Sequence, residues 1–220
     1  MKTRVILADD HRIVRDGLCA LLTREEDIEI VGVADDGAQA VRLVQRLQPD
    51  VLVTDVSMPG LNGVECVRRL RAGDGRVHAL CLSMHGDPRT VISAIDAGAT
   101  GYLLKDACCE ELVRGVRAVA AGRVHLSASL VDMVVQYQRS RRIAAPAARP
   151  PAPALTARER EIAQLLSEGL TTQQIADRLY VTGKTVATHR ENIMHKLGIH
   201  GIAELTRYAL REGLSSLDVA

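Results

Sequence analysis

The sequence contains neither tryptophan nor phenylalanine, and only 2% of its residues are aromatic. A hydrophobic core must therefore be built from Val, Leu, Ile and Ala, which the 47% hydrophobic content of the 220 residues permits. No segment approaches the roughly 18 uninterrupted apolar residues of a membrane span. The first residues also reach the charged pair Asp9-Asp10 too soon for a signal peptide. These absences predict a protein with no membrane partner.

Disulfide and structural zinc patterns are also missing. The five cysteines are an odd number, form no C-x-x-C pair and have no histidine at metal-binding spacing. The pattern favours a reduced, cytoplasmic protein over a disulfide-rich secreted one.

Charge and proline divide the chain into three parts. The formal net charge of +1 says little about partners, but four prolines crowd residues 146–154, where neither a helix nor a central strand can form. The basic run Arg139-Ser-Arg-Arg142 comes just before them. We therefore expect a first domain over residues 1–122, a helix and extended linker over 123–154, and a second domain over 155–220.

The first domain alternates between strand and helix patterns. Between its short apolar runs lie one-sided helical stripes, for example Val41, Val44 and Leu47. Repeated strand–helix units predict an α/β fold with a parallel sheet, a flavodoxin-like (βα)5 domain. The expected strands are residues 4–8, 28–33, 51–54, 79–83 and 101–104.

Polar residues stand where these expected strands end. Singly, an Asp pair after a strand is usually a turn or a helix cap, and a lysine there is usually solvated. At the carboxyl edge of a parallel sheet, however, Asp9, Asp10, Asp55, Ser83 and Lys105 would meet. Clustered carboxylates suit Mg²⁺, and the lysine and the hydroxyl suit a phosphoryl group. Because no glycine-rich phosphate loop is present, an acyl phosphate on a carboxylate fits better than a bound nucleotide.

The sequence around these residues resembles the receiver domain of two-component response regulators of the NarL/FixJ type. The resemblance covers nearly all of residues 3–122. The segments that carry the resemblance are Val5-Ile-Leu-Ala-Asp-Asp-His11, Asp55-Val-Ser-Met-Pro-Gly60, Leu82-Ser-Met-His85 and Gly101-Tyr-Leu-Leu-Lys-Asp106. The resemblance implies that Asp55 is the phosphoacceptor and that Asp10, Asp9 (largely through water), Asp55 and the carbonyl of Ser57 hold Mg²⁺. It also implies that Ser83 and Tyr102 form the pair that reports phosphorylation and that Lys105 contacts the phosphoryl group.

The second domain has the pattern of four short helices. Thr156–Glu159 and Thr171–Gln174 both fit the capping box, and Gly169 and Gly198 stand where helices end. A helix, the short turn Tyr180-Val-Thr182 and a helix with polar outward residues indicate a helix-turn-helix, although a hairpin with a solvated face is commoner in proteins generally. Equal numbers of acidic and basic residues in 155–220 are also a poor electrostatic footprint for DNA.

Several phrases of this domain resemble the LuxR-type DNA-binding domain throughout residues 155–213, among them Leu155-Thr-Ala-Arg-Glu-Arg-Glu161 and Asn192-Ile-Met-His-Lys-Leu-Gly198. By that resemblance, Lys184, Thr185, Arg190 and Lys196 are expected to contact phosphates, and Ala187, Thr188 and Glu191 to face base edges. His189 fits packing and a phosphate contact equally well. The helix over 202–212 is the family's usual dimerisation element, and its exposed apolar candidates are expected to be Leu205, Tyr208 and Ala209.

Together these features predict a DNA-binding transcriptional response regulator. A sensor histidine kinase would phosphorylate Asp55, and the phosphorylated homodimer would bind double-stranded promoter DNA, with RNA polymerase as a further partner. The protein would not be an enzyme beyond its own phosphotransfer and dephosphorylation. One alternative is a phosphorylation-independent LuxR-type factor with a vestigial receiver. Others are a LuxR-type sensor of a small ligand and a Mg²⁺-dependent phosphatase, which would want a second Asp where Ser57 stands.

Overall fold

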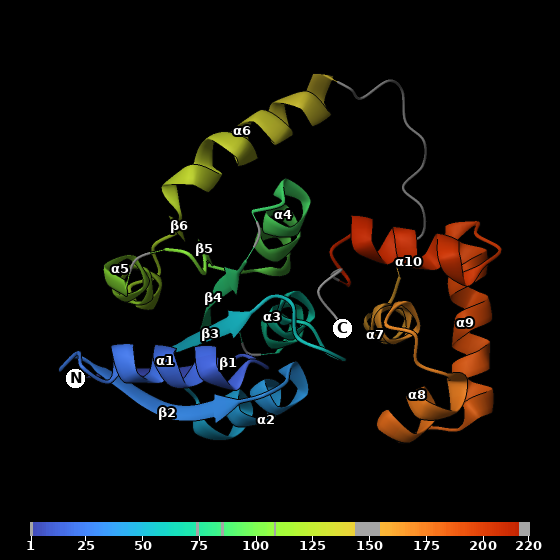
Figure 1. The fold of residues 1–220 in the computed structure, drawn as a ribbon, viewed down its shortest axis with the longest axis horizontal. Helices are drawn as coiled ribbons and strands as arrows, with labels where there is room; N and C mark the ends of the chain where they lie inside the picture. The colour runs from blue at the N-terminus through green and yellow to red at the C-terminus, as the bar shows by residue number, and fades with distance from the viewer. Residues whose placement is uncertain (1, 74, 85, 108, 144–154, 216–220) are drawn as a thin grey trace. The chain divides into compact units, whose positions relative to one another are not determined.

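The computed structural model describes residues 2–73, 75–84, 86–107, 109–143 and 155–215. These form two compact units, residues 1–138 and 139–220, and each is described by itself. Figure 1 shows strands and helices in the first unit and helices alone in the second. The Pro-rich segment 144–154 that the sequence predicts to be a linker lies outside the described residues.

The first unit contains a six-stranded parallel sheet with the strand order β2-β1-β3-β4-β5-β6. The predicted doubly wound α/β fold is therefore confirmed. The short edge strand β6 was not expected, because two residues give no periodic pattern. The strands are β1 (Thr3–Ala8), β2 (Ile28–Ala34), β3 (Val51–Asp55), β4 (His78–Ser83), β5 (Gly101–Leu104) and β6 (His125–Leu126).

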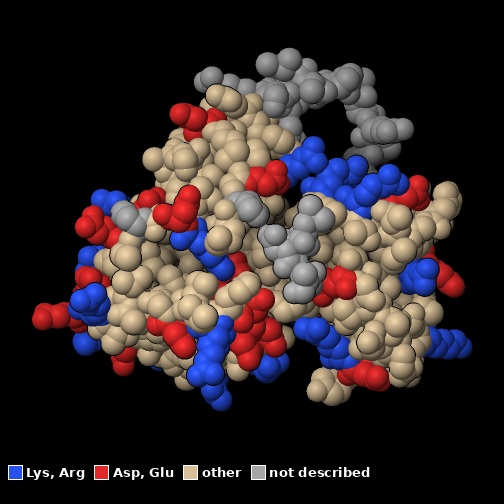
Figure 2. Space-filling model, viewed as in Figure 1, with Lys and Arg blue, Asp and Glu red and all other residues tan. Residues whose placement is uncertain are grey.

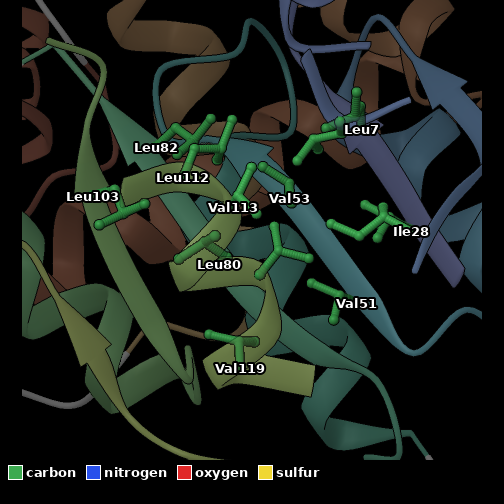
Figure 3. Close-up of a cluster of buried hydrophobic side chains, with 13 residues drawn as sticks. Leu7, Ile28, Val51, Val53, Leu80, Leu82, Leu103, Leu112, Val113 and Val119 are labelled. Carbon is green, nitrogen blue, oxygen red and sulfur yellow. The ribbon is translucent and has the colours of Figure 1, made fainter. Parts of the chain in front are cut away.

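Helices cover both faces of this sheet. Residues of α1 and α5 pack on one face, and Figure 3 shows Leu112, Val113 and Val119 of α5 among the buried side chains of the strands. Residues of α2, α3 and α4 pack on the other face. Branched aliphatic side chains fill both layers, as the missing Phe and Trp require. The helices are α1 (Arg12–Leu22), α2 (Gly37–Leu47), α3 (Gly63–Ala72), α4 (Pro88–Ala97) and α5 (Cys109–Ala120).

A further helix, α6 (Ala128–Ile143), follows β6. The predicted helix in the 123–154 region is thus present, but its first part belongs to the first unit. The buried side chain of Leu130 lies in one hydrophobic cluster with residues of α4 and β5, and Met133 and Val134 pack against that cluster.

The second unit consists of four helices, as predicted: α7 (Ala157–Ser167), α8 (Thr172–Arg178), α9 (Gly183–Leu197) and α10 (Ile202–Arg211). The predicted capping boxes at Thr156 and Thr171 are both formed. The Thr182 hydroxyl accepts a hydrogen bond from the N–H of Thr185 and begins α9, as expected. Each of these starts is written locally in the sequence, which is why they could be predicted.

The prediction that α10 exposes its apolar residues is wrong. Leu205 and Ala209 are fully buried in the hydrophobic core of the second unit, and Tyr208 is half-buried against it. Residues four apart on a helix share one face, and this face packs towards α7. Leu205 and Ala209 therefore stabilise the unit from inside and are not available for a dimer contact. None of the helices in the described residues is long and apolar enough to cross a membrane.

Candidate functional site

The polar residues at the carboxyl edge of the sheet come together as predicted. Asp9 follows β1 and Asp55 ends β3, and these two strands are neighbours. Lys105 follows β5, and its Nζ lies 2.8 Å from Asp9 Oδ2 and 3.0 Å from Asp55 Oδ2. A single ammonium thus bridges two carboxylates that would otherwise repel each other.

These charges are buried. Asp9 and Asp55 are each 1% exposed, and the Lys105 side chain is 7% exposed. Burial raises the pKa of Asp55, the Lys105 ammonium opposes that rise, and the Asp9 carboxylate adds to it. Burial lowers the pKa of Lys105, but the Asp55 and Asp9 carboxylates outweigh it, so that its pKa is raised and the ammonium is retained.

The donor set fits a hard divalent cation. Asp9, Asp10, His11 and Asp55 each offer one ligand atom, and these atoms lie within 4.8 Å of one another. Asp10 Oδ1 and both carboxylate oxygens of Asp55 are buried and accept no well-aligned hydrogen bond from the described residues. Buried oxygens with unused lone pairs are the ligands that Mg²⁺ takes in proteins.

His11 was not expected at this site. Its Nδ1 lies 3.1 Å from Asp10 Oδ1, and its backbone N–H donates a 2.8 Å hydrogen bond to Asp9 Oδ1. Its imidazole is 65% exposed. Adjacency to the Asp pair was the only sequence signal, and adjacency does not show where a side chain turns.

Close backbone packing holds Asp55 in place. A Cβ on Gly63, the first residue of α3, would lie 2.0 Å from the Asp55 carbonyl oxygen, so glycine is required for this approach. The Thr54 hydroxyl donates to the same carbonyl at 3.0 Å. The backbone N–H of Ser57 faces the Asp55 carboxylate and favours its charged form. Ser57 is half-buried.

Ser83 and Tyr102 meet on neighbouring strands, as the sequence predicts for a linked pair. Ser83 is 5% exposed and Tyr102 is fully buried. Burial raises the pKa of the Tyr102 phenol, and a hydrogen bond with the Ser83 side chain partly opposes that rise. The backbone N–H of Lys105 donates to the Ser83 carbonyl at 2.8 Å, so that this pair is joined directly to the charged cluster.

In the second unit, α9 presents the predicted outward face. Val186 and Ile193 are buried in the core, while the opposite side of the helix is exposed. His189 and Thr185 are half-buried, and the Thr185 hydroxyl lies 2.9 Å from that of Thr182. The exposed residues of this face are Lys184, Ala187, Thr188, Glu191 and His195, and Arg190 is exposed beside the buried face.

Lys196 differs from the expectation of a free phosphate contact. Its Nζ lies 2.7 Å from Oε2 of Glu159, a buried residue at the start of α7. The same Oε2 accepts the backbone N–H of Thr156 at 2.8 Å. Lys196 therefore ties the end of α9 to the first turn of α7, a contact between residues 37 apart in the chain that no local pattern reveals.

Basic side chains do not dominate the visible surface. Figure 2 shows Lys and Arg together with Asp and Glu on the visible face of each unit.

Comparisons with known proteins agree with both units. Residues 5–117 match the family described as "Response regulator receiver domain", and residues 153–209 match "Bacterial regulatory proteins, luxR family". The chain is 37% identical over 213 residues to the probable transcriptional regulatory protein NarL of Mycobacterium tuberculosis, covering 97% of this chain and 96% of that protein. It is 37% identical over 211 residues to the transcriptional regulatory protein LiaR of Bacillus subtilis, covering 96% and 98%.

Solved structures agree as well. A LuxR-family two-component response regulator from Aurantimonas is similar with a TM-score of 0.61 and 34% identity, over 63% of this chain and 99% of that one. The response regulator ChrA of a heme-sensing two-component system is similar over 97% of this chain and 98% of that one, with a TM-score of 0.53 and 36% identity.

Proposed function

Since this chain belongs to the LuxR-family response regulators and is a DNA-binding response regulator of a two-component system, we propose that Asp55 accepts a phosphoryl group from a sensor histidine kinase. The observation that carries the proposal is the buried Asp55 carboxylate, with Lys105 Nζ at 3.0 Å and the oxygens of Asp9 and Asp10 beside it. The Lys105 ammonium and the Ser57 N–H keep this carboxylate charged, and a charged carboxylate can act as a nucleophile.

The surrounding residues have distinct tasks in this reaction. An Asp55 oxygen attacks phosphorus, and the bond from phosphorus to the donor breaks. Lys105 loses its contact with the Asp55 charge and is then free to pair with a phosphoryl oxygen. The Ser83 hydroxyl can donate to another phosphoryl oxygen, which changes its hydrogen bond with Tyr102. The contacts of Gly63 and Thr54 hold the Asp55 backbone still meanwhile.

Mg²⁺ is the cofactor that we propose for the acidic cluster. Asp9, Asp10, Asp55 and the Ser57 carbonyl would hold it, and it would neutralise charge between the carboxylates and the incoming phosphoryl oxygens. Lys105 alone cannot balance three carboxylates, which supports a cation at this position.

The chemistry of the site does not support a phosphatase acting on other molecules. Position 57 carries Ser, where a phosphatase with an Asp nucleophile would want a second Asp as acid or base. We therefore propose that the catalysed reactions are limited to phosphorylation and dephosphorylation of Asp55 itself. The complete set of Asp9, Asp10, Asp55, Ser83 and Lys105 also favours this function over a vestigial receiver.

The DNA-binding unit would act on promoter DNA through α9, and the protein would therefore act in the cytoplasm. Lys184 and Arg190 would hold phosphates, and Thr188 and Glu191 would reach base edges. We propose that the phosphorylated form binds as a dimer and that RNA polymerase is a further partner. Because Leu205 and Ala209 are buried, the dimer contact has to use other residues.

Mass spectrometry tests the central step. Incubation with acetyl phosphate and Mg²⁺ should add one phosphoryl group, and Asp55→Asn should abolish the gain. Thr54→Ser is a matched control next to the nucleophile, because it keeps the hydroxyl that bonds the Asp55 carbonyl. An equal mass gain in Asp55→Asn would refute the assignment.

A further inference from the structure

The helix α6 is attached to β5, which comes just before Lys105, and to Gly86, which lies three residues after Ser83. At its start, the Ser127 N–H donates to the carbonyl of Tyr102 at 3.1 Å, and the Leu104 N–H donates to the Ser127 hydroxyl at 3.3 Å. These bonds tie α6 to β5 immediately before Lys105. The N–H of Leu130 in turn donates to the Ser127 carbonyl at 2.9 Å.

The second attachment is a close contact with the segment between β4 and α4. Gly86 comes three residues after Ser83, and a Cβ placed on it would lie 2.6 Å from Leu130 Cδ2, 3.3 Å from Met133 Cε and 3.5 Å from Leu104 Cδ2. Leu130 is only 1% exposed. Leu130 thus fills the space that a side chain at position 86 would need.

Leu130 also lies in the same cluster as Tyr102, the hydrogen-bond partner of Ser83. Tyr102 and Leu130 belong to the same buried cluster, together with Val91 and Ala94 of α4. Ser83 is thus connected to the surroundings of Leu130 in two ways, through the nearby Gly86 and through its hydrogen bond with Tyr102. Packed interiors respond to changes in such contacts by switching between arrangements rather than by stretching.

We propose that the packing contact between Leu130 and Gly86 relays phosphorylation of Asp55 to α6. In the unphosphorylated protein α6 is docked on α4 and β5. Phosphorylation of Asp55 shifts Ser83 and Gly86. Leu130 then loses its contact with Gly86, and the first turns of α6 detach from α4 and β5. Residues 128–137 then join the tether that leads to the DNA-binding unit, which gives that unit a longer reach. The inference rests on the proposed phosphorylation of Asp55.

Hydrogen–deuterium exchange on the full chain tests the relay, with mass gain on Asp55 measured in the same samples. In the wild type, acetyl phosphate with Mg²⁺ should make the amides of residues 130–137 exchange about tenfold faster or more. Leu130→Ala should show this fast exchange without the phosphodonor and little further change with it. Val131→Ala, one residue along on the exposed side of α6, is the matched control and should behave as the wild type.

The outcomes separate the two proposals. If Asp55 gains no mass, the proposed function fails. If Asp55 gains mass while the exchange of α6 stays unchanged, or if Leu130→Ala matches Val131→Ala, the relay is overturned. Should Leu130→Ala also speed exchange in β1 and β3, Gly86→Ala carries the test, because its Cβ presses on Leu130 while leaving the core intact. Fast exchange of α6 in Gly86→Ala supports the relay, and wild-type exchange overturns it.

Discussion

At the scale of single residues, the acidic cluster stores an electrostatic cost. Asp9 and Asp55 are buried side by side with Lys105 as the shared cation, and the pKa of Asp55 is raised, chiefly by burial. A carboxyl group whose pKa is higher in the folded state binds its proton more tightly there. Folding stability therefore falls as the pH rises from the ordinary Asp value through the raised one.

Asp55→Asn should consequently stabilise the first unit. The amide removes one buried negative charge, and the expected gain at pH 7 is about 1 kcal/mol or more, which raises Tm by roughly 4 °C per kcal/mol. The difference between variant and wild type should shrink as the pH is lowered below the ordinary Asp range. Thermal unfolding between pH 4 and pH 8, without Mg²⁺, measures this; a lower Tm for the variant at pH 7 would contradict the electrostatic argument.

Lys196 was expected to contact DNA phosphates, but in the structure it has a stabilising role. Its bond with Glu159 joins α9 to α7, and Glu159 also accepts the N–H of Thr156. Burial raises the pKa of Glu159, but the bonds from Lys196 and Thr156 outweigh it and leave the pKa lowered. This contact therefore contributes stability at neutral pH that is lost as the pH falls through the lowered pKa.

We expect Lys196→Ala to destabilise the DNA-binding unit by about 1–3 kcal/mol, because it leaves a buried carboxylate without its cation. Lys184→Ala is the matched control. Lys184 is exposed in the first turn of α9, where a cation is unfavourable to the helix dipole, so its loss should weaken DNA binding without lowering Tm. Unfolding and DNA titrations on both variants distinguish the roles. Equal Tm values for the Lys196→Ala and Lys184→Ala variants would show that the bond between Lys196 and Glu159 does not stabilise the unit.

At the scale of helices and strands, the sequence predicted most of the fold. Strand and helix periods, together with the hydroxyl caps at Thr156, Thr171 and Thr182, are local signals and were confirmed. Contacts between distant segments were not predictable in the same way. The carboxyl-edge rule for parallel sheets brought Asp9, Asp55 and Lys105 together. The rule that the apolar stripe of a helix faces the core would also have placed Leu205 and Ala209 of α10 inside, but the family resemblance was followed instead. No comparable rule says that Lys196 meets Glu159.

The turn between α8 and α9 contains a local conflict. Tyr180 has a φ of 53°, in the left-handed region, and its side chain is 95% exposed. The strain of a side chain in this region is therefore not offset by packing.

Tyr180→Gly should stabilise the DNA-binding unit by about 0.5–1 kcal/mol, since relief of left-handed strain exceeds the extra entropy of glycine in the unfolded chain. Tyr180→Ala is the control: it removes the same ring but keeps Cβ, so it should give no such gain. Chemical denaturation compares the three proteins. A glycine variant less stable than the alanine variant would show that strain is not the governing factor.

At the scale of the whole molecule, each unit has a hydrophobic core of its own. In the part of the chain that the structure describes, the core of the DNA-binding unit is made from residues between Leu155 and Leu214. The core of the receiver unit likewise ends at α6. Two complete cores joined through a proline-rich segment predict separate folding and separate activities.

A fragment of residues 150–220 should therefore fold alone and bind DNA without any phosphodonor. Its thermal transition should be cooperative and should match the corresponding transition of the full chain. Leu165→Ala, a truncation in the buried core of α7, should destabilise both forms equally, by about 2–5 kcal/mol. A smaller loss in the full chain would mean that the receiver unit supports this core. If the fragment shows no cooperative transition, the core is incomplete; if it folds but fails to bind DNA at any concentration, recognition needs more of the chain than α9 and its supporting helices.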